Sequence, residues 1–309
     1  MKRFCVVGTG SMGARHIKNL AEIFDQKCEQ VEIDVLRSSM GPLSSILSGQ
    51  IHKELYSVEE MQGTYDAIII ANPTSEHYNS LLELKDKSGA FFIEKPVFDK
   101  ISYNTETFNG RLIYVAAPLR YTGLFGAVKE ITQKERVLFA RAICSSFLPE
   151  WRPGTDYSRG YSARKELGGG VEMDLIHEWD YLIELFGYPD KVHSIIARES
   201  SLDIDTNDIA DYIAQYPDLI INLHLDYFGR VNRRELELFL EDDTVVVDFI
   251  KGEIRWLSDS HSISYKEERD DYQKKELEYF LNLVSRKETE SSNNLRKALK
   301  TLRIAKGEF

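Results

Sequence analysis

The chain has 309 residues, of which 42% are hydrophobic and 29% are charged, and its formal net charge is −11 at pH 7. This length is sufficient for two domains, each with its own core. The acidic balance argues against a nucleic-acid-binding surface, which needs a basic face, and no apolar run approaches the roughly 20 residues of a membrane span. We therefore expect no nucleic-acid partner and no membrane insertion.

The cysteines and the N-terminal residues indicate the cellular compartment in which we expect the protein. Cys5, Cys28 and Cys144 are scattered and odd in number, which is typical of reduced thiols and not of a disulfide framework. The sequence contains no C-x-x-C or H-E-x-x-H spacing of metal ligands. Met1 and the two basic residues after it pass directly into a strand-like run, which leaves no room for a signal peptide. We expect a cytoplasmic protein without a bound metal.

The first 115 residues alternate strand-like and helix-like segments. Apolar runs predict strands at 3–7, 31–37, 66–71, 90–94 and 112–116, and the segments between them predict helices at 11–25, 42–48, 57–62, 75–87 and 100–109. Strands that are apolar throughout and separated by helices indicate a parallel sheet covered on both faces. Ligands bind such sheets at the carboxyl ends of the strands.

A glycine-rich turn follows the first predicted strand. The apolar run 4–7 stops at a G-x-G-x-x-G pattern, residues 8–13, which leads directly into the helix at 11–25. In dinucleotide-binding folds the first glycine makes a tight turn, the second lets the backbone approach a pyrophosphate, and the third lets helix and strand pack closely. The helix N-terminus then binds the phosphates. The pattern predicts a dinucleotide site that includes Gly8, Gly10, Ser11, Met12 and Gly13.

The end of the second predicted strand bears on the choice between NAD and NADP. NAD sites usually have an acidic residue about 20 residues after the glycine loop, where it binds the ribose 2′-hydroxyl. Here the strand ends in Arg37, followed by Ser38 and Ser39, and an arginine beside serines suits a 2′-phosphate. Asp34 is the alternative ribose ligand if the strand ends earlier. We interpret Asp34 as mid-strand and predict that Arg37 and Ser38 favour NADP over NAD.

A lysine follows the predicted strand at 90–94. In Glu94-Lys95-Pro96 the lysine lies at the carboxyl end of the strand, on the ligand side of the sheet, and the proline biases it to an extended conformation. An ammonium group there can donate a hydrogen bond to a substrate hydroxyl or carbonyl. The competing interpretation is a surface lysine in a strand–loop turn.

From about residue 137 the pattern changes to long strands, several with period-two alternation. Strands are predicted at 137–148, 191–198, 209–216, 219–228, 233–241 and 244–250, and helices at 171–186, 271–285 and 293–305. Asp242-Asp243, between two of these strands, is typical of a hairpin turn. The fold class is therefore α/β, with a Rossmann domain at 1–118 and an α+β domain at 119–309 that has a large, mostly antiparallel sheet with one open face. The last helix either stays with the second domain or packs back on the first.

The segment Trp151–Lys165 is rich in basic and aromatic side chains. It has four basic residues and one acidic residue in a chain of net charge −11, and it precedes a glycine run. Arginine and tyrosine together, here Arg152 and Tyr161, suit recognition of a carboxylate or phosphate and stacking on a sugar. The segment thus predicts an anionic substrate, such as a sugar acid or nucleotide sugar. The competing interpretation is a solvated loop that balances acidic neighbours.

Three glycines, 168–170, open the predicted helix at 171–186. Asp174 and His177 are three residues apart and share a helix face. Histidine exchanges a proton readily near neutral pH, and a neighbouring carboxylate can orient its ring. The opposite stripe is apolar and consists of Leu175, Trp179, Leu182, Ile183 and Phe186. The polar face either contacts only solvent or carries an acid–base pair. The preceding glycines favour the pair, because they let a backbone or a ligand approach closely.

Three motifs follow one another along the chain: the glycine loop, Glu94-Lys95-Pro96, and the glycine run that leads into Asp174 and His177. In this order they resemble the glucose–fructose oxidoreductase/inositol dehydrogenase/MocA (Gfo/Idh/MocA) family. The segment 72–77, Asn-Pro-Thr-Ser-Glu-His, is similar to the family's T-P-x-x-x-H cofactor segment. His16 and Arg120 also fall where the family places such residues. The resemblance extends over essentially the whole chain.

One spacing departs from the family pattern. Many members separate the aspartate and the histidine by four positions, whereas Asp174 and His177 are three apart. Both spacings keep the two side chains on one helix face. The division of roles between Asp174 and Asp180 therefore stays open.

The resemblance implies a hydride transfer with nicotinamide at the domain interface. Lys95 and Asp174 position the reacting hydroxyl, and His177 exchanges its proton as general acid and base. The implied cofactor contacts beyond the glycine loop and Arg37 come from Asn72, Pro73, Thr74, His77, Glu94 and Lys95. The implied substrate contacts come from Lys95, Arg120, Arg152, Tyr161, Asp174 and His177. Family members also pair through the open sheet, which implies a homodimer or homotetramer.

The sequence thus predicts an NAD(P)-dependent oxidoreductase, with NADP preferred, that acts on a hydroxyl or carbonyl of a sugar, sugar acid, cyclitol or nucleotide sugar. One alternative is a glycoside hydrolase that acts through transient oxidation by tightly held NAD⁺. The other is a non-catalytic, cofactor-sensing protein, which would have no reason to keep Lys95, Asp174 and His177.

Overall fold

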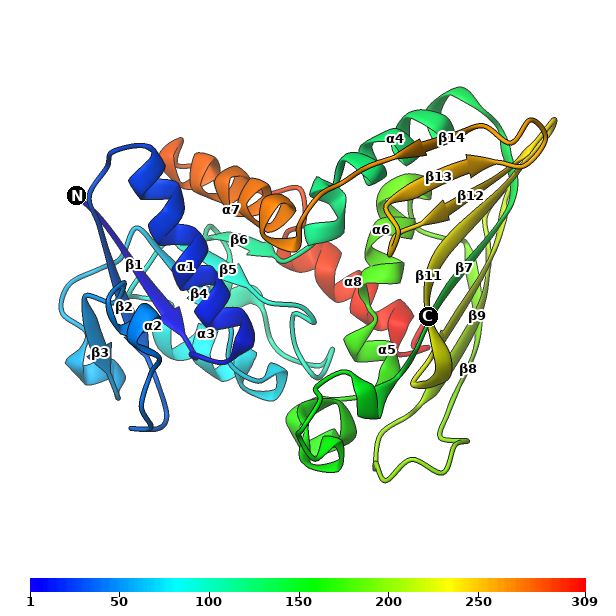
Figure 1. The fold of residues 1–309 in the computed structure, drawn as a ribbon. Coiled ribbons are helices and arrows are strands. Elements are labelled where there is room, and N and C mark those ends of the chain that lie inside the picture. The colour runs from blue at the N-terminus through cyan, green and yellow to red at the C-terminus, as the bar shows by residue number, and fades with distance from the viewer. The chain divides into compact units, whose positions relative to one another are not determined.

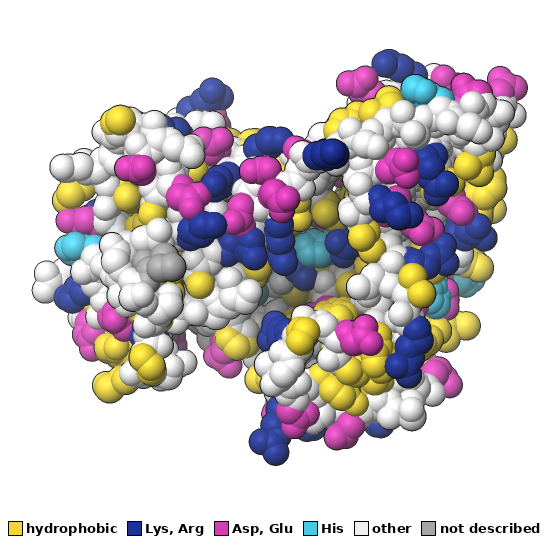
Figure 2. Space-filling model, viewed as in Figure 1, with side chains coloured by type: hydrophobic (Ala, Val, Ile, Leu, Met, Phe, Trp, Pro, Cys, Tyr) yellow, Lys and Arg dark blue, Asp and Glu magenta, His cyan; other side chains and the backbone are white. Residues whose placement is uncertain are grey.

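The computed structural model describes residues 1–309, apart from the side chain of Ile46. The chain divides into two compact units, Met1–Ala116 with Arg269–Leu299, and Ala117–Glu268 with Lys300–Phe309. Each unit has its own sheet (Figure 1). Among the described residues, no helix combines the length and the apolar composition needed to cross a membrane. Acidic and basic side chains are interspersed on the face drawn in Figure 2.

The sheet of the first unit is parallel throughout, in the order β3-β2-β1-β4-β5-β6. Its strands are β1 (Lys2–Val7), β2 (Val31–Leu36), β3 (Lys53–Leu55), β4 (Ala67–Ile70), β5 (Ala90–Ile93) and β6 (Leu112–Val115). All residues of β4, β5 and β6 are buried, as expected for strands covered on both faces. The strand order reverses between β1 and β4, which is where open α/β sheets bind ligands. The predicted parallel sheet is confirmed, and β3 is an additional edge strand.

The helices of the first unit are α1 (Ser11–Gln26), α2 (Ser45–Ser48), α3 (His77–Leu84) and α7 (Arg269–Ser285). α7 lies beside α1 (Figure 1), and Lys18 Nζ of α1 bonds Asp270 Oδ2 of α7 at 2.9 Å. The predicted helices at 57–62 and 100–109 are wrong: each segment forms only one 3₁₀ turn, Val58–Glu60 and Glu106–Phe108. In the second segment Asn104 Oδ1 accepts a bond from the Glu106 backbone N–H, a local contact that competes with a helix.

The second unit contains an eight-stranded sheet in the order β14-β13-β12-β11-β7-β10-β9-β8. Its strands are β7 (Val137–Phe147), β8 (Lys191–Ala197), β9 (Ile209–Gln215), β10 (Ile220–Asp226), β11 (Phe228–Leu240), β12 (Thr244–Asp248), β13 (Glu253–Trp256) and β14 (Ser262–Ser264). Only β7 and β10 pair in parallel, so the predicted, mostly antiparallel sheet is confirmed. The predicted hairpin turn is also present, because Leu240 N–H bonds Asp243 O at 2.9 Å.

One face of this sheet is covered and the other is open. On the covered face, Tyr212 of β9 is buried, packs edge-on against Trp179 and donates a hydrogen bond to the Ala305 carbonyl. On the other face, Ile195 is 72% exposed and Ile213 is 54% exposed. The helices around the covered face are α4 (Gly123–Lys134), α5 (Val171–Asp174), α6 (His177–Phe186) and α8 (Leu295–Ala305).

Candidate functional site

The glycine loop has the geometry that its pattern predicts. Gly8 has φ +88°, and a Cβ on it would lie 2.9 Å from the Cα of Asn72. A Cβ on Gly13 would lie 1.9 Å from the carbonyl oxygen of Gly8, so helix α1 packs directly on the turn. Gly10 caps α1, and no heavy atom lies within 4 Å of the place of its missing Cβ. Gly8 and Gly13 are thus required for packing, whereas Gly10 leaves room at the helix N-terminus for a pyrophosphate, with Ser11 in the same first turn.

His77 connects the turns that follow β4 and β5. Its Nε2 lies 2.9 Å from the carbonyl oxygen of Asn72, and its Nδ1 lies 3.0 Å from the carbonyl oxygen of Pro96. The ring is buried, and this burial lowers the pKa of His77. The Asn72 amide donates to Ser80 Oγ at 2.8 Å. Of the other two predicted cofactor residues in this segment, Pro73 is exposed and Thr74 is buried.

Lys95 is half-buried at the carboxyl end of β5, between two anchored residues. On one side, Glu94 Oε1 lies 2.6 Å from His16 Nε2 of α1, and both side chains are buried. Burial raises the pKa of Glu94, but its contact with His16 and the nearby charge of Lys95 outweigh this effect and hold the pKa below its ordinary value. On the other side, the carbonyl of Pro96 meets His77, and the Lys95–Pro96 bond is cis. The backbone of Lys95 is therefore held from both sides.

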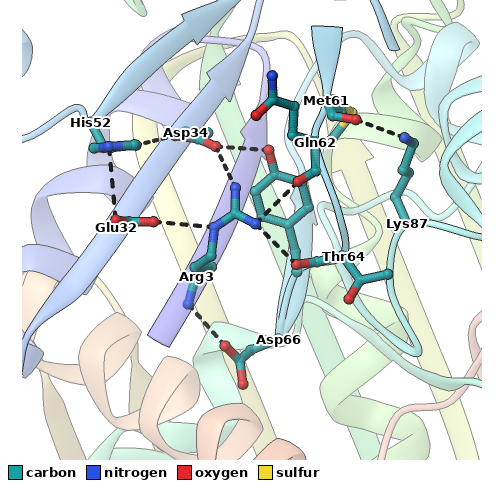
Figure 3. A network of polar contacts seen from close by, with 10 residues as sticks. Arg3, Glu32, Asp34, His52, Met61, Gln62, Thr64, Asp66 and Lys87 are labelled. Carbon is teal, nitrogen blue, oxygen red and sulfur yellow. Dashed lines mark hydrogen bonds and ion pairs between the residues drawn. The ribbon is translucent and has the colours of Figure 1, made fainter. Parts of the chain in front are cut away.

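Asp34 lies in the middle of β2, which continues to Leu36, so the mid-strand interpretation is confirmed. Its carboxylate is buried and accepts a hydrogen bond from the Tyr65 hydroxyl at 2.7 Å. Arg3 and His52 also contact it, at 3.4 Å and 2.9 Å (Figure 3). Through these contacts, Asp34 belongs to a network of polar side chains between neighbouring strands.

Arg37 directly follows β2, and its side chain is 7% exposed. Its Nη1 donates to Glu54 Oε2 of β3 at 2.6 Å, and its Nη2 donates to the carbonyl oxygen of Gly41 at 2.6 Å. The buried Nε has no hydrogen-bond partner within the protein. Ser38, the next predicted cofactor residue, is exposed. Sequence reasoning missed Glu54, which becomes a neighbour of Arg37 only through the pairing of β2 with β3.

The predicted helix at 171–186 is wrong as a single helix. It is broken into α5, which ends at Asp174, and α6, which begins at His177. Leu175 has φ −96° and ψ 20°, and Glu178 N–H bonds the Leu175 carbonyl three residues back, so the chain tightens between the two helices. The glycine run packs against the preceding loop: a Cβ on Gly169 would lie 2.2 Å from the carbonyl oxygen of Tyr161.

Asp174 and His177 lie on either side of this break, and both are half-buried. Asp174 Oδ2 accepts a hydrogen bond of 2.5 Å from the hydroxyl of Tyr227. Tyr227 is fully buried, and burial together with the charge of Asp174 raises its pKa well above the ordinary value. The hydroxyl therefore keeps its proton and donates a hydrogen bond to the carboxylate. No pattern in the sequence marks Tyr227, because it approaches Asp174 only through the fold.

The segment 151–165 begins beside Tyr227. Trp151 packs edge-on against Tyr227, with ring centroids 5.3 Å apart, and its Nε1 donates to Ser146 Oγ at 2.9 Å. Tyr161 donates to the carbonyl oxygen of Gly168 at 2.9 Å, which closes the segment onto the glycine run. Arg152 is exposed.

Arg120 and Asp180 form a bidentate ion pair. The Nε of Arg120 lies 2.8 Å from Asp180 Oδ2, and Nη2 lies 2.7 Å from Oδ1. The Nη1 of Arg120 also donates to Glu184 Oε2 at 2.8 Å. On the same helix, the fully buried Glu178 lies 2.9 Å from Arg234 Nε of β11. Asp180 thus binds an arginine, whereas Asp174 accepts a hydrogen bond from a tyrosine, and ion pairs with Arg120 and Arg234 fix α6.

Residues 2–107 match the model of the Gfo/Idh/MocA family, which is described as an oxidoreductase family with an NAD-binding Rossmann fold. They are an NAD-binding domain of this oxidoreductase family. The resemblance found in the sequence motifs is confirmed. Among the described residues, no cluster of three or more histidine, cysteine or acidic side chains is arranged to hold a metal ion.

A curated relative is the uncharacterized oxidoreductase YrbE of Bacillus subtilis (strain 168), which is 23% identical over 218 residues. This alignment covers 65% of the chain, and the chain spans 60% of the length of YrbE.

Two solved structures extend the similarity in fold to both units. UDP-N-acetylglucosamine 3-dehydrogenase GnnA from Acidithiobacillus ferrooxidans has a TM-score of 0.80 at 18% identity, covering 99% of this chain and 96% of that one. Levoglucosan dehydrogenase, in complex with NADH, has a TM-score of 0.84 at 13% identity, covering 99% and 95%. At these identities the likeness establishes a shared fold over both units.

Proposed function

We propose that this chain is an NAD(P)-dependent dehydrogenase or reductase. It transfers a hydride between nicotinamide and a carbon of a sugar, sugar acid, cyclitol or nucleotide sugar. The observation that carries the proposal is the position of Lys95, anchored at the carboxyl end of β5 in a domain whose glycine loop leaves space for a dinucleotide. The names of GnnA and levoglucosan dehydrogenase support the substrate class, since one acts on a nucleotide sugar and the other on an anhydrosugar.

In the proposed oxidative direction, the substrate hydroxyl loses a proton and its carbon loses a hydride. Lys95 donates a hydrogen bond to the reacting oxygen, and Asp174 orients the hydroxyl. His177 accepts the hydroxyl proton as the carbon–oxygen bond becomes a carbonyl. Bound NAD(P)⁺ supplies the acceptor for the hydride that leaves carbon. In the reductive direction His177 returns the proton to the oxygen.

The proposed substrate is anionic. Arg152 is exposed on the segment anchored by Trp151, and it can bind a carboxylate or phosphate through a bidentate pair. Tyr161 contributes a ring for stacking on a sugar. Because Arg120 already holds Asp180 and Glu184, we assign it to fixing α6 and not to binding substrate.

Two further proposals concern the oligomeric state and the cellular location of the enzyme. The open sheet face, with Ile195 and Ile213 exposed, is proposed to pair with a second copy in a homodimer or homotetramer. Cys5, Cys28 and Cys144 are free thiols, which suits the cytoplasm that we propose as its location.

Replacing Tyr227 with phenylalanine is expected to lower turnover about tenfold and to change the KM for substrate less. The variant removes a hydrogen bond to a carboxylate, which is worth about 1.5–3 kcal/mol, and leaves Asp174 less well oriented. Steady-state kinetics measures both constants, and thermal unfolding reports the cost to the fold. Tyr216→Phe is the matched control, since its buried hydroxyl donates to the Gly187 carbonyl instead. A change in stability with unaltered turnover would remove Tyr227 from the mechanism.

The preference for NADP is proposed to depend on Arg37. Arg37→Asp is expected to weaken NADP binding by about tenfold to a hundredfold relative to NAD, because a charge-assisted hydrogen bond to the 2′-phosphate is worth about 1.5–3 kcal/mol. Isothermal titration of both cofactors measures the ratio of dissociation constants, which cancels any general effect of losing the contact with Glu54. An equal loss for NAD and NADP would remove Arg37 from a 2′-phosphate site.

The substrate is best found with a panel of sugars, sugar acids, cyclitols and nucleotide sugars, each offered with NAD and with NADP. Absorbance of the reduced nicotinamide is expected to change with at least one member. A sugar released while the absorbance stays constant would instead favour the glycoside hydrolase. Cofactor binding without any turnover across the panel would favour the cofactor-sensing protein.

A further inference from the structure

Two oppositely charged side chains meet at the carboxyl ends of β2 and β3. The strands are parallel neighbours, Leu36 pairs with Leu55, and the backbone N–H of Arg37 donates to the Leu55 carbonyl at 2.9 Å. This pairing brings Glu54 to Arg37, with Nη1 and Oε2 2.6 Å apart. The side chain of Arg37 is 7% exposed, whereas that of Glu54 is 37% exposed. Glu54 is therefore the more accessible of the two side chains.

The carboxylate of Glu54 is held in place from a second side. The hydroxyl of Tyr56 donates to Glu54 Oε2 at 3.0 Å, the same oxygen that Arg37 contacts. The hydrogen bond from Arg37, with a smaller contribution from Tyr56, lowers the pKa of Glu54. Glu54 is thus ionised at neutral pH and forms a fixed negative charge beside the arginine.

We propose that Glu54 determines how far this chain prefers NADP, by opposing a ribose 2′-phosphate at Arg37. Glu54 already occupies one N–H of the guanidinium, and a 2′-phosphate brings further negative charge toward its carboxylate. A 2′-hydroxyl can instead donate a hydrogen bond to that carboxylate. Glu54, on β3, therefore does what an acidic residue at the end of β2 does in NAD sites, and it limits the NADP preference that Arg37 alone predicts.

The inference rests on the proposed function only in requiring that a nicotinamide dinucleotide binds at the glycine loop, so its test needs no substrate. Full-length wild type and Glu54→Gln are titrated with NAD and with NADP by calorimetry. Glutamine keeps an oxygen for Arg37 and removes the charge. Glu54→Gln is expected to tighten NADP binding about tenfold, in line with removal of one nearby like charge, and to leave NAD binding unchanged or weaker.

Glu60→Gln is the matched control, because it removes one negative charge from the same part of the chain, and Glu60 Oε2 accepts from the Tyr56 backbone N–H and not from Arg37. It is expected to shift neither cofactor by more than a small factor. Equal effects of Glu54→Gln on NAD and NADP, or the same NADP gain in Glu60→Gln, would overturn the role of Glu54. Failure of the wild type to bind either cofactor would overturn the proposed function itself, and the inference with it.

Discussion

Replacing His177 with alanine is expected to lower turnover by about 10²–10⁴-fold, the usual contribution of a positioned general acid or base. The imidazole is the group proposed to take the hydroxyl proton, and alanine leaves the site without an acceptor. Cofactor affinity is expected to stay nearly unchanged, since the glycine loop and Arg37 belong to the other unit. Steady-state turnover and cofactor titration on the same preparation measure the two effects.

The local fold around His177 is expected to survive this change. His177 begins α6, and that helix is held by the Arg120–Asp180 and Glu178–Arg234 ion pairs, which the substitution leaves in place. Thermal unfolding of His177→Ala should therefore resemble that of the wild type. His261→Ala is the matched control, because His261 is exposed in the turn between β13 and β14. Near-normal turnover in His177→Ala would show that another group exchanges the proton.

Replacing Lys95 with alanine is expected to lower turnover by about 10²–10³-fold, the usual cost of removing one donor to a developing oxyanion. The ammonium is proposed to stabilise negative charge on the reacting oxygen, and it acts most strongly at the transition state. The backbone at this position stays anchored through Glu94 with His16 and Pro96 with His77. The loss is therefore expected in turnover and not in folding or cofactor binding.

Lys100→Ala is the matched control for Lys95→Ala, since Lys100 is exposed in the segment that follows β5. Turnover, the KM for substrate and the dissociation constant for cofactor are compared across the two variants. A Lys95→Ala enzyme that differs from wild type only in KM would assign Lys95 to ground-state binding. One with normal constants throughout would make it a surface lysine of the strand–loop turn.

Sequence patterns predicted the first unit well because its strands and its glycine loop depend on residues that are close together in the sequence. A run of four buried residues such as Ala67–Ile70 has little alternative to a strand, and the glycine loop follows its strand without interruption. Gly8 and Gly13 could be assigned from spacing because each makes one backbone contact that only glycine permits. Short elements were less predictable: β3 is an edge strand of three residues with a single buried side chain.

Several features of the second unit depend on contacts that the sequence does not contain. The sequence patterns did not indicate α4: it starts with Gly123, has Gly126 in its first turn, and depends on a cap from Thr122 Oγ1. The continuous helical pattern of residues 171–186 conceals a break at Leu175, because both short helices continue the same apolar pattern.

The site residues divide in the same way. Lys95 and His177 could be named from motifs that lie within a few residues of each side chain. Glu54 and Tyr227 could not, because they reach Arg37 and Asp174 only through strand pairing and packing, across 17 and 53 residues of sequence. Asp180 shows the opposite case: its role stayed open in the sequence, and the structure pairs it with Arg120.

The central claim is that a hydride passes from the substrate carbon to the nicotinamide and remains there as a product. The most direct measurement uses the substrate found in the panel, deuterated at the carbon that carries the reacting hydroxyl, and analyses the released cofactor by mass spectrometry. Deuterium in the reduced nicotinamide, in equal amount to the carbonyl product, is the expected result. Product formation with no deuterium in any released cofactor would contradict the claim.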